Sequence, residues 1–318
     1  MNPCIVDKYR PMDRYFQNAV PQSPIPGQLG MRLCLLLWAI CLAAISSYAV
    51  NPNEIREDSD SEQSEQLDWP VREFPDPKSI VGGFNEGERF QFRGQWGIFR
   101  KVGQITIATE LAENSDPSML LVKTEARTVG FIKALFPLLL KGSALLDTSK
   151  GRILENQVTD EGRSNERDAN TQFDFDSGLM RHVDNLRPDK SRNRPLPYGT
   201  PLDYASAILQ MRGWELEPDK EHPLFIASNG KFYLIEMRTT GTDLLNTKFG
   251  EIEAYRIEPI SAFPQSRIFR EGGNMAIWIS KDHRRIPLRL DVKTSIGTAS
   301  MRLESFDLNG DSVVASTR

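Results

Sequence analysis

The polar residues of this 318-residue chain that could do chemistry fall in two short segments. They are Asp203, Arg212, Asp282, Arg284 and Arg285. Two carboxyl groups facing each other across a cleft would permit acid–base hydrolysis, and arginine side chains would bind an anionic group. Asp203 and Arg212, however, would lie on opposite sides of one helix, so they cannot grip the same small group.

Each of these residues also has a structural interpretation, which we favour over a catalytic one. A carboxylate such as Asp203 stabilises the start of a helix through a free N–H and the helix dipole. Asp282 precedes a tight turn, where a carboxylate commonly accepts backbone hydrogen bonds. Arg284 and Arg285 would point to opposite faces of a strand that begins there. We therefore assign no catalytic residue.

Metal and cofactor motifs do not emerge from the sequence. The histidines, His182, His222 and His283, are scattered and lack partners at metal-ligand spacing. The segment 307–311 resembles a calcium loop, but its glycine comes two places early, which favours a hairpin or terminal turn. No phosphate loop or dinucleotide fingerprint occurs. The balance of 39 basic and 43 acidic residues gives no indication of nucleic acid binding.

An export signal is indicated at residues 31–49, where one arginine precedes an apolar run and small residues end the segment. Residues 1–30 have two interpretations. Either the start codon has been assigned too early and Met31 is the true first residue, or these residues form a cytoplasmic tail. In the second case, residues 31–49 would remain as an anchor in the inner membrane. Residues 50–80 are acidic and predict a disordered tether. We expect the remainder in the periplasm of a Gram-negative-type bacterium, touching a membrane only through the signal or anchor, and a chain cut after Ala49 would contain no cysteine.

Period-two alternation dominates residues 81–307 and predicts a single β domain, followed by a C-terminal tail at 308–318. Neighbouring strands should pair as an antiparallel meander, with a two-residue hairpin turn at Asn229 and Gly230. The polar stretch 185–193 reads as an exposed loop. The strand segments are 90–98, 104–109, 120–128, 153–159, 171–175, 224–227, 232–238, 253–257, 275–280, 286–293 and 300–306.

Two short helical segments are expected to pack on this sheet. Thr200 could serve as N-cap, with Pro201 at the first helical position and a helix running to Arg212, where Gly213 stops it. The apolar segment 131–140 is split by Pro137, which predicts a helical turn before the proline and a strand after it.

Several motifs resemble the bacterial exported "domain of unknown function 3108" family. They are Phe84-Asn85-Glu86-Gly87-Glu88-Arg89-Phe90, Trp96-Gly97, Val102-Gly103, the segment 202–212, Phe249-Gly250 with Ala254, and the segment 277–287. The resemblance covers nearly all of residues 82–306. It implies a strongly curved antiparallel sheet, a half-barrel or open barrel similar to those that carry lipoproteins between bacterial membranes. It implies no activity.

Three functions stay open, and the first is non-catalytic binding of a lipid or other amphiphile in an apolar cavity. Its candidate site residues are Phe131, Leu135, Phe136, Leu139, Ile208, Arg212 and Trp278. The competing interpretation is that these apolar side chains simply form the core. The second function is a structural or interaction module that holds an envelope protein, and the third is a hydrolase of envelope polymers.

Overall fold

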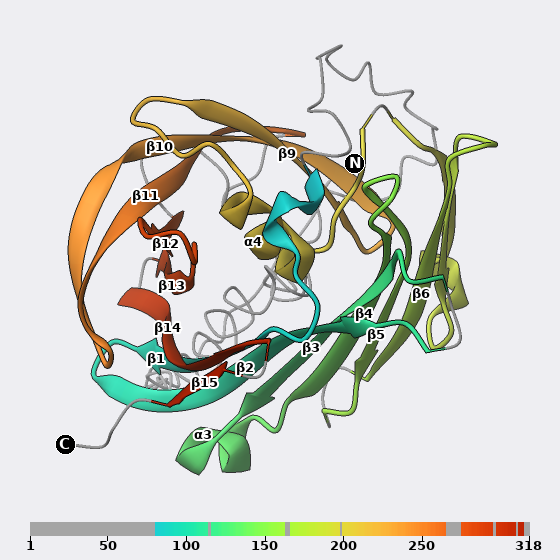
Figure 1. The fold of residues 1–318 in the computed structure, drawn as a ribbon. Coiled ribbons are helices and arrows are strands. Elements are labelled where there is room, and N and C mark those ends of the chain that lie inside the picture. The colour runs from blue at the N-terminus through green and yellow to red at the C-terminus, as the bar shows by residue number, and fades with distance from the viewer. Residues whose placement is uncertain are drawn as a thin grey trace, which may run out of the picture.

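A computed structural model describes residues 80–113, 116–162, 166–197, 199–264, 275–294, 297–309 and 311–314. Within these residues 15 strands form one sheet, which curves strongly around a helix without closing (Figure 1). The prediction of a mainly β fold with a strongly curved antiparallel sheet is therefore confirmed. The segments expected as upstream region, export signal and acidic tether lie outside the described residues, except for Ile80.

The strands are β1 Arg89–Trp96, β2 Phe99–Leu111, β3 Met119–Thr128, β4 Leu139–Asp147, β5 Arg152–Asp160, β6 Arg167–Asp174, β7 Leu179–Asp184, β8 Arg192–Pro195, β9 Glu221–Ser228, β10 Lys231–Thr247, β11 Gly250–Phe263, β12 Met275–Ser280, β13 Pro287–Thr294, β14 Gly297–Leu308 and β15 Asp311–Val314. The helices are η2 Val81–Gly83, α3 Gly130–Leu135, η3 Pro188–Lys190 and α4 Tyr204–Arg212.

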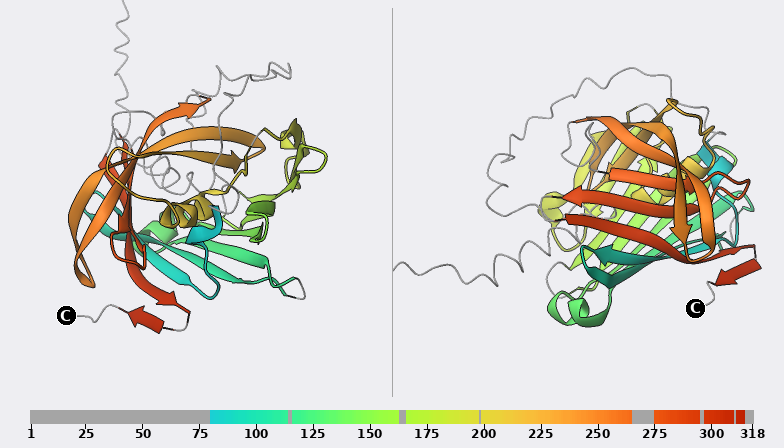
Figure 2. Two further views of the ribbon diagram at one scale, coloured as in Figure 1. Left: turned by 45° about the horizontal axis from the view of Figure 1, so that its top comes forward. Right: turned by 90° about the vertical axis from the view of Figure 1, so that its left-hand side faces the viewer.

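Two meanders make up the sheet. One runs from β1 to β8 and the other from β9 to β14, and they join where β1 pairs with β14 (Figure 2). This junction brings Phe90 opposite Phe306, although the two residues come from opposite ends of the domain. The expected meander is thus confirmed within each run. The pairing of the two runs depends on tertiary structure alone.

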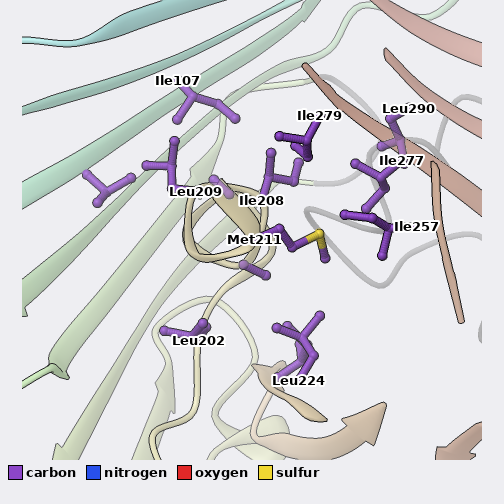
Figure 3. Packing of buried hydrophobic residues seen from close by; sticks show 14 of the residues in the cluster. Ile107, Leu202, Ile208, Leu209, Met211, Leu224, Ile257, Ile277, Ile279 and Leu290 are labelled. Atoms are coloured by element: carbon purple, nitrogen blue, oxygen red, sulfur yellow. The ribbon is translucent and has the colours of Figure 1, made fainter. Parts of the chain in front are cut away.

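The concave side of the sheet is occupied by α4, in which every residue from Ala205 to Arg212 is buried. Side chains from both meanders surround it (Figure 3). Ile107 of β2 lies on one side of Leu209, while Ile277 and Ile279 of β12 lie beyond Ile208. Because α4 is buried all round, its packing, and not an amphipathic pattern, holds it in place.

The helix begins later than the sequence predicts, because the residues before it form an extended bridge. Leu202 donates its N–H to the carbonyl of Phe225 at 2.9 Å and accepts the N–H of Ala227 at 2.9 Å. Extended backbone here cannot also be helical, so Thr200 is not the N-cap. Asp203 takes that position, and its carboxylate accepts from the N–H groups of Ala205 and Ser206.

The two terminal strands of the sheet, β8 and β9, are protected against further strand pairing, whereas β10 beyond Arg238 has a partner strand on one side only. The bridge to Leu202 uses the backbone groups of Phe225 and Ala227, so the odd-numbered residues of β9 direct their N–H and C=O groups away from β10. Pro223 is one of these residues and has no N–H to donate. The other edge, β8, has four residues and carries Arg192, Arg194 and Pro195. Short strands, charge and proline are the usual means of blocking an edge. The segment 185–193, expected as a loop, includes η3 and the start of this edge strand.

Local turn signals match the structure closely. Asn229 and Gly230 both have positive φ, 52° and 67°, and Ser228 pairs with Lys231 across them. Helix α3 ends before Pro137 and β4 follows it, as expected. At the C-terminus the sheet continues past residue 307, where a tail was expected, because β15 folds back and pairs with the end of β14. This pairing agrees with a hairpin near Asp307.

Candidate functional site

Arg212 lies at the centre of a buried polar cluster that was not predicted from the sequence. Its guanidinium makes a two-point ion pair with the Glu88 carboxylate, with 2.8 Å from Nη2 to Oε1. Both side chains are 4 % exposed. The same group also donates to three backbone carbonyls, those of Gly83 at 2.9 Å, Arg285 at 3.0 Å and Arg284 at 3.3 Å.

These contacts use all the hydrogen-bonding capacity of Arg212. A guanidinium has five N–H donors, and each of them meets one acceptor in this cluster. The Phe90 ring covers one face of the group, with the guanidinium carbon 4.9 Å from the ring centroid. Arg212, a candidate ligand-binding residue, therefore joins α4, η2, β1 and the β12–β13 turn and has no donor left for a ligand.

Asp203 and Asp282 both serve local backbone structure. Asp203 also accepts from the Ser206 hydroxyl at 2.7 Å, and burial raises the pKa of its carboxyl despite these bonds. Asp282 accepts from Ser280 at 2.8 Å and from Arg284 at 2.6 and 2.9 Å. Although partial burial opposes it, the hydrogen bonds from Arg284 and Ser280 hold the pKa of Asp282 below its ordinary value.

The β12–β13 turn also forms the floor of a cavity of about 640 Å³, which we call the notch pocket. It lies beyond the β12–β13 turn, where β11 on one side and β14, paired there with β15, on the other side continue. Its lining residues are Phe249, Glu251, Ile252, Glu253, Lys281, Asp282, Arg284 and Phe306. Phe249 meets Phe306 edge to face at 5.2 Å, and the Arg284 guanidinium lies 5.8 Å from the Phe306 ring. Arg285 turns away at positive φ and lies over Tyr255.

The apolar candidates from the sequence are not brought together. Ile208 lies in the core beside α4's other residues, and Trp278 lies on the opposite face of β12 from Ile277, where its indole N–H donates to Asp243 at 2.8 Å. Phe131 and Leu135 of α3 are 54 % and 52 % exposed, outside the curve of the sheet (Figure 1). Phe136 and Leu139 are half-buried between these extremes.

Sequence reasoning assigned no role to Glu88, Lys281 or the apolar pocket residues Phe249, Ile252 and Phe306. A signal did exist for most of them, because Glu88, Phe249 and Lys281 lie within the motifs quoted above. Their roles depend on contacts between distant segments: Glu88 and Arg212 are 124 residues apart. Spacing along one strand or helix does not reveal such a pair.

His182 is buried against the β9–β10 turn and has an unusually low pKa. Its Nδ1 is 2.8 Å from the Thr171 hydroxyl, and a Cβ on Gly230 would lie 3.0 Å from its ring. Burial, reinforced by Arg167, lowers the pKa of His182 from 6.5 to about 4, with Asp184 opposing. Over the described ranges no group of three or more His, Cys, Asp or Glu side chains could hold a metal ion.

This shift makes stability depend on pH. The unfolded chain takes up a proton near pH 6.5 and the folded chain only near pH 4, so acidification over that range favours unfolding. The decrease in the free energy of unfolding reaches about 3 kcal/mol once the pH is below the pKa of the folded state. Urea denaturation at pH 7.5 and 4.5 should show a smaller decrease for His182→Gln than for the unchanged chain. Equal decreases in the two proteins would contradict the assignment.

Fold and site together define an open β-barrel-like domain with a helix as its core and a small pocket at one end of the barrel wall. The chain belongs to the family described as "Protein of unknown function (DUF3108)", whose model matches residues 91–304. No curated protein matches the sequence. No helix in the described part of the chain is long and apolar enough to cross a bilayer.

Three solved structures are similar at low identity. A β-barrel-like DUF1849 protein from Brucella abortus has 6 % identity and a TM-score of 0.47, over 70 % of this chain and 97 % of that one. A Bacteroides fragilis protein, provisionally called an exported protein with a YmcC-like fold, has 10 % identity and a TM-score of 0.27, over 70 % and 97 %. A provisionally named lipoprotein from Parabacteroides distasonis has 11 % identity and a TM-score of 0.27, over 74 % of this chain and 97 % of that one.

Proposed function

We propose that this protein is an exported, non-catalytic binding protein of the bacterial cell envelope that holds an amphipathic ligand in the notch pocket. The export signal read at residues 31–49 supports the location. The observation that carries the binding proposal is the pocket itself, because α4 already fills the concave side of the sheet. Its volume of about 640 Å³ lies within the usual range for small-molecule sites.

The lining of the pocket suits a ligand with one apolar and one polar end. Phe249, Ile252 and Phe306 supply an apolar wall, and each methylene buried there would contribute about 0.8 kcal/mol. No specific polar group is then needed for useful affinity.

The charges around the pocket favour a zwitterionic head group. Lys281 pairs with Glu253 and Arg284 with Asp282, which leaves both signs of charge beside the apolar wall. Glu251 adds a further carboxylate. An anionic head alone would meet three carboxylates, and a cationic head alone would meet two cations. A head carrying both charges could bind each sign with its opposite.

Native mass spectrometry of the full chain with dodecylphosphocholine below its micellar concentration tests the proposal. We expect one bound equivalent, and weaker binding of dodecyl maltoside, which has the same chain and no charge. Phe249→Ser should weaken binding about 10- to 100-fold, since it removes roughly 1.5–3 kcal/mol of apolar burial.

Leu244→Ser is the matched control, because Leu244 is an apolar residue of the same hairpin that is 66 % exposed and does not line the pocket. This variant should bind like the unchanged chain. Absence of uptake by the unchanged chain, or equal uptake by Phe249→Ser, would overturn the proposal.

Neither alternative function gains a supporting observation. Strand addition to a partner is opposed at the terminal strands β8 and β9. The stretch of β10 beyond Arg238 pairs with β11 alone, but nothing in its pairing indicates a partner. A hydrolase of envelope polymers would need a carboxylic acid that stays protonated near neutral pH. Asp203, whose pKa is raised by burial, caps α4 and does not line the pocket. Asp282, which does line it, has its pKa held below the ordinary value by hydrogen bonds from Arg284 and Ser280, although burial opposes this.

A further inference from the structure

A second apolar feature lies at the opposite end of β1 from the notch pocket. Five residues form it, and we call them the tip patch: Trp96, Ile98, Phe99, Phe131 and Leu135. Trp96 ends β1, Ile98 lies in the turn and Phe99 begins β2, while the last two residues come from α3. Ile98 is 88 % exposed and Phe99 39 % exposed.

The two parts of the tip patch touch each other and form one surface. The Phe99 and Phe131 rings are 5.4 Å apart, and the Trp96 and Phe99 rings 6.1 Å apart. Large exposed apolar side chains are common as single residues, but a contiguous group of them marks an interaction site.

The fold holds α3 in this position through contacts on its inner side. Ile132 is buried, while Val129 donates its N–H to the Val102 carbonyl at 3.1 Å. The Thr128 hydroxyl bridges the segment after α3 by donating to the Phe136 carbonyl and accepting from the Leu138 N–H. Phe131 and Leu135 therefore point outward from an anchored helix and not from a loose loop.

Basic side chains border the tip patch. Arg100, Lys101 and Lys133 are exposed, and none of them makes an ion pair with a carboxylate in the part of the chain that the structure describes. The segments 96–103 and 129–141 contain no acidic residue. These two segments therefore bring only positive charge to the border of the apolar residues. The nearby Glu304 of β14, whose pKa is lowered, against the effect of burial, by Lys248, Arg93 and Lys101, is already paired with Lys248 and Arg93.

Exposed aromatic and aliphatic side chains at a hairpin turn and a short helix, bordered by lysine and arginine, suit the surface of an anionic bilayer. Apolar side chains can enter the interfacial region to a depth of about 5–10 Å. Each Lys or Arg near an anionic lipid surface contributes about 1 kcal/mol. The basic border favours a bilayer with anionic head groups as the occupant over an uncharged apolar partner.

We propose that the tip patch docks this domain on an anionic lipid bilayer, with Ile98, Phe131 and Leu135 entering the interface and Arg100, Lys101 and Lys133 near the lipid phosphates. This docking would be distinct from any membrane contact of residues 31–49. It does not depend on a ligand in the notch pocket.

Hydrogen–deuterium exchange of the full chain with vesicles tests this docking locally. Vesicles of phosphatidylglycerol and phosphatidylethanolamine should slow exchange in peptides covering 97–101 and 130–136. Vesicles of pure phosphatidylcholine should not, although the apolar segment 33–45 could insert into either. The protection should decrease as salt is raised from about 0.05 to 0.5 M, since screening weakens attraction to the surface.

The double variant Ile98→Ser and Phe131→Ser should lose this protection completely. The control is Leu111→Ser with Leu244→Ser, which changes residues that are 43 % and 66 % exposed on other parts of the sheet. It should retain the protection. Equal protection by both kinds of vesicle, or protection that survives the Ile98 and Phe131 changes, would overturn the proposal. Protection without vesicles that rises with protein concentration would also overturn it, because a second copy would then cover the patch.

Discussion

Replacing Glu88 with alanine is expected to lower the free energy of unfolding by about 3–5 kcal/mol, because it leaves the Arg212 guanidinium buried without its counter-charge. Arg212→Met should cost a similar amount for the converse reason, and it would also release the carbonyls of Gly83, Arg284 and Arg285. Urea denaturation followed by circular dichroism would measure both losses.

A double variant, Glu88→Leu with Arg212→Met, distinguishes the buried pair from two independent packing sites. It removes both charges, so its loss should be clearly smaller than the sum of the two single losses. The exposed pair Glu253 and Lys281 is the control, and breaking it should cost no more than about 1 kcal/mol. Additive losses at Glu88 and Arg212 would contradict the coupling derived from their geometry.

Gly83→Ala is expected to destabilise the domain by about 3 kcal/mol or more, the upper end of the range for overpacking. A Cβ on Gly83 would overlap the Leu209 carbonyl oxygen and lie 2.9 Å from its carbon, both of them backbone atoms of α4. A backbone cannot rotate away as a side chain can. The end of α4 would have to move away from η2, which would also stretch the bond from Arg212 to the Gly83 carbonyl.

The neighbouring glycine provides a matched control for this prediction. A Cβ on Gly82 would lie 3.6 Å from the nearest atom of Gly213, an ordinary contact. Gly82→Ala should therefore change the free energy of unfolding by less than about 1 kcal/mol. Thermal and urea unfolding of the two variants would compare them directly, and equal stability would show that η2 does not approach α4 as closely as described.

The two proposals concern separate parts of the domain and can fail separately. Phe306 of the notch pocket pairs with Phe90 near the start of β1, whereas Trp96 of the tip patch ends the same strand. Six residues of a strand separate these ends by roughly 20 Å. Ligand uptake should therefore be unaffected by Ile98→Ser, and vesicle protection by Phe249→Ser.

The sequence by itself determined the local elements. Alternation of apolar and polar residues places strands at, for example, 120–128 and 286–293, where β3 and β13 lie. The Asn229-Gly230 turn and the break at Pro137 follow from backbone preferences of single residues, which act over a few positions. Strand β7 was not foreseen, and β8 begins in the polar stretch 185–193, whose pairing depends on its neighbours.

Only the tertiary structure decided how these elements meet. The pairing of β1 with β14, the extended bridge at Leu202 that delays α4, and the Glu88 to Arg212 pair all join residues far apart in sequence. Tertiary structure also decided which of the apolar residues between 131 and 140 are buried, because these residues are of similar type and the sequence does not distinguish them. Ile132 and Leu140 became core, while Phe131 and Leu135 became surface, because burial depends on which face of α3 and β4 meets the rest of the fold.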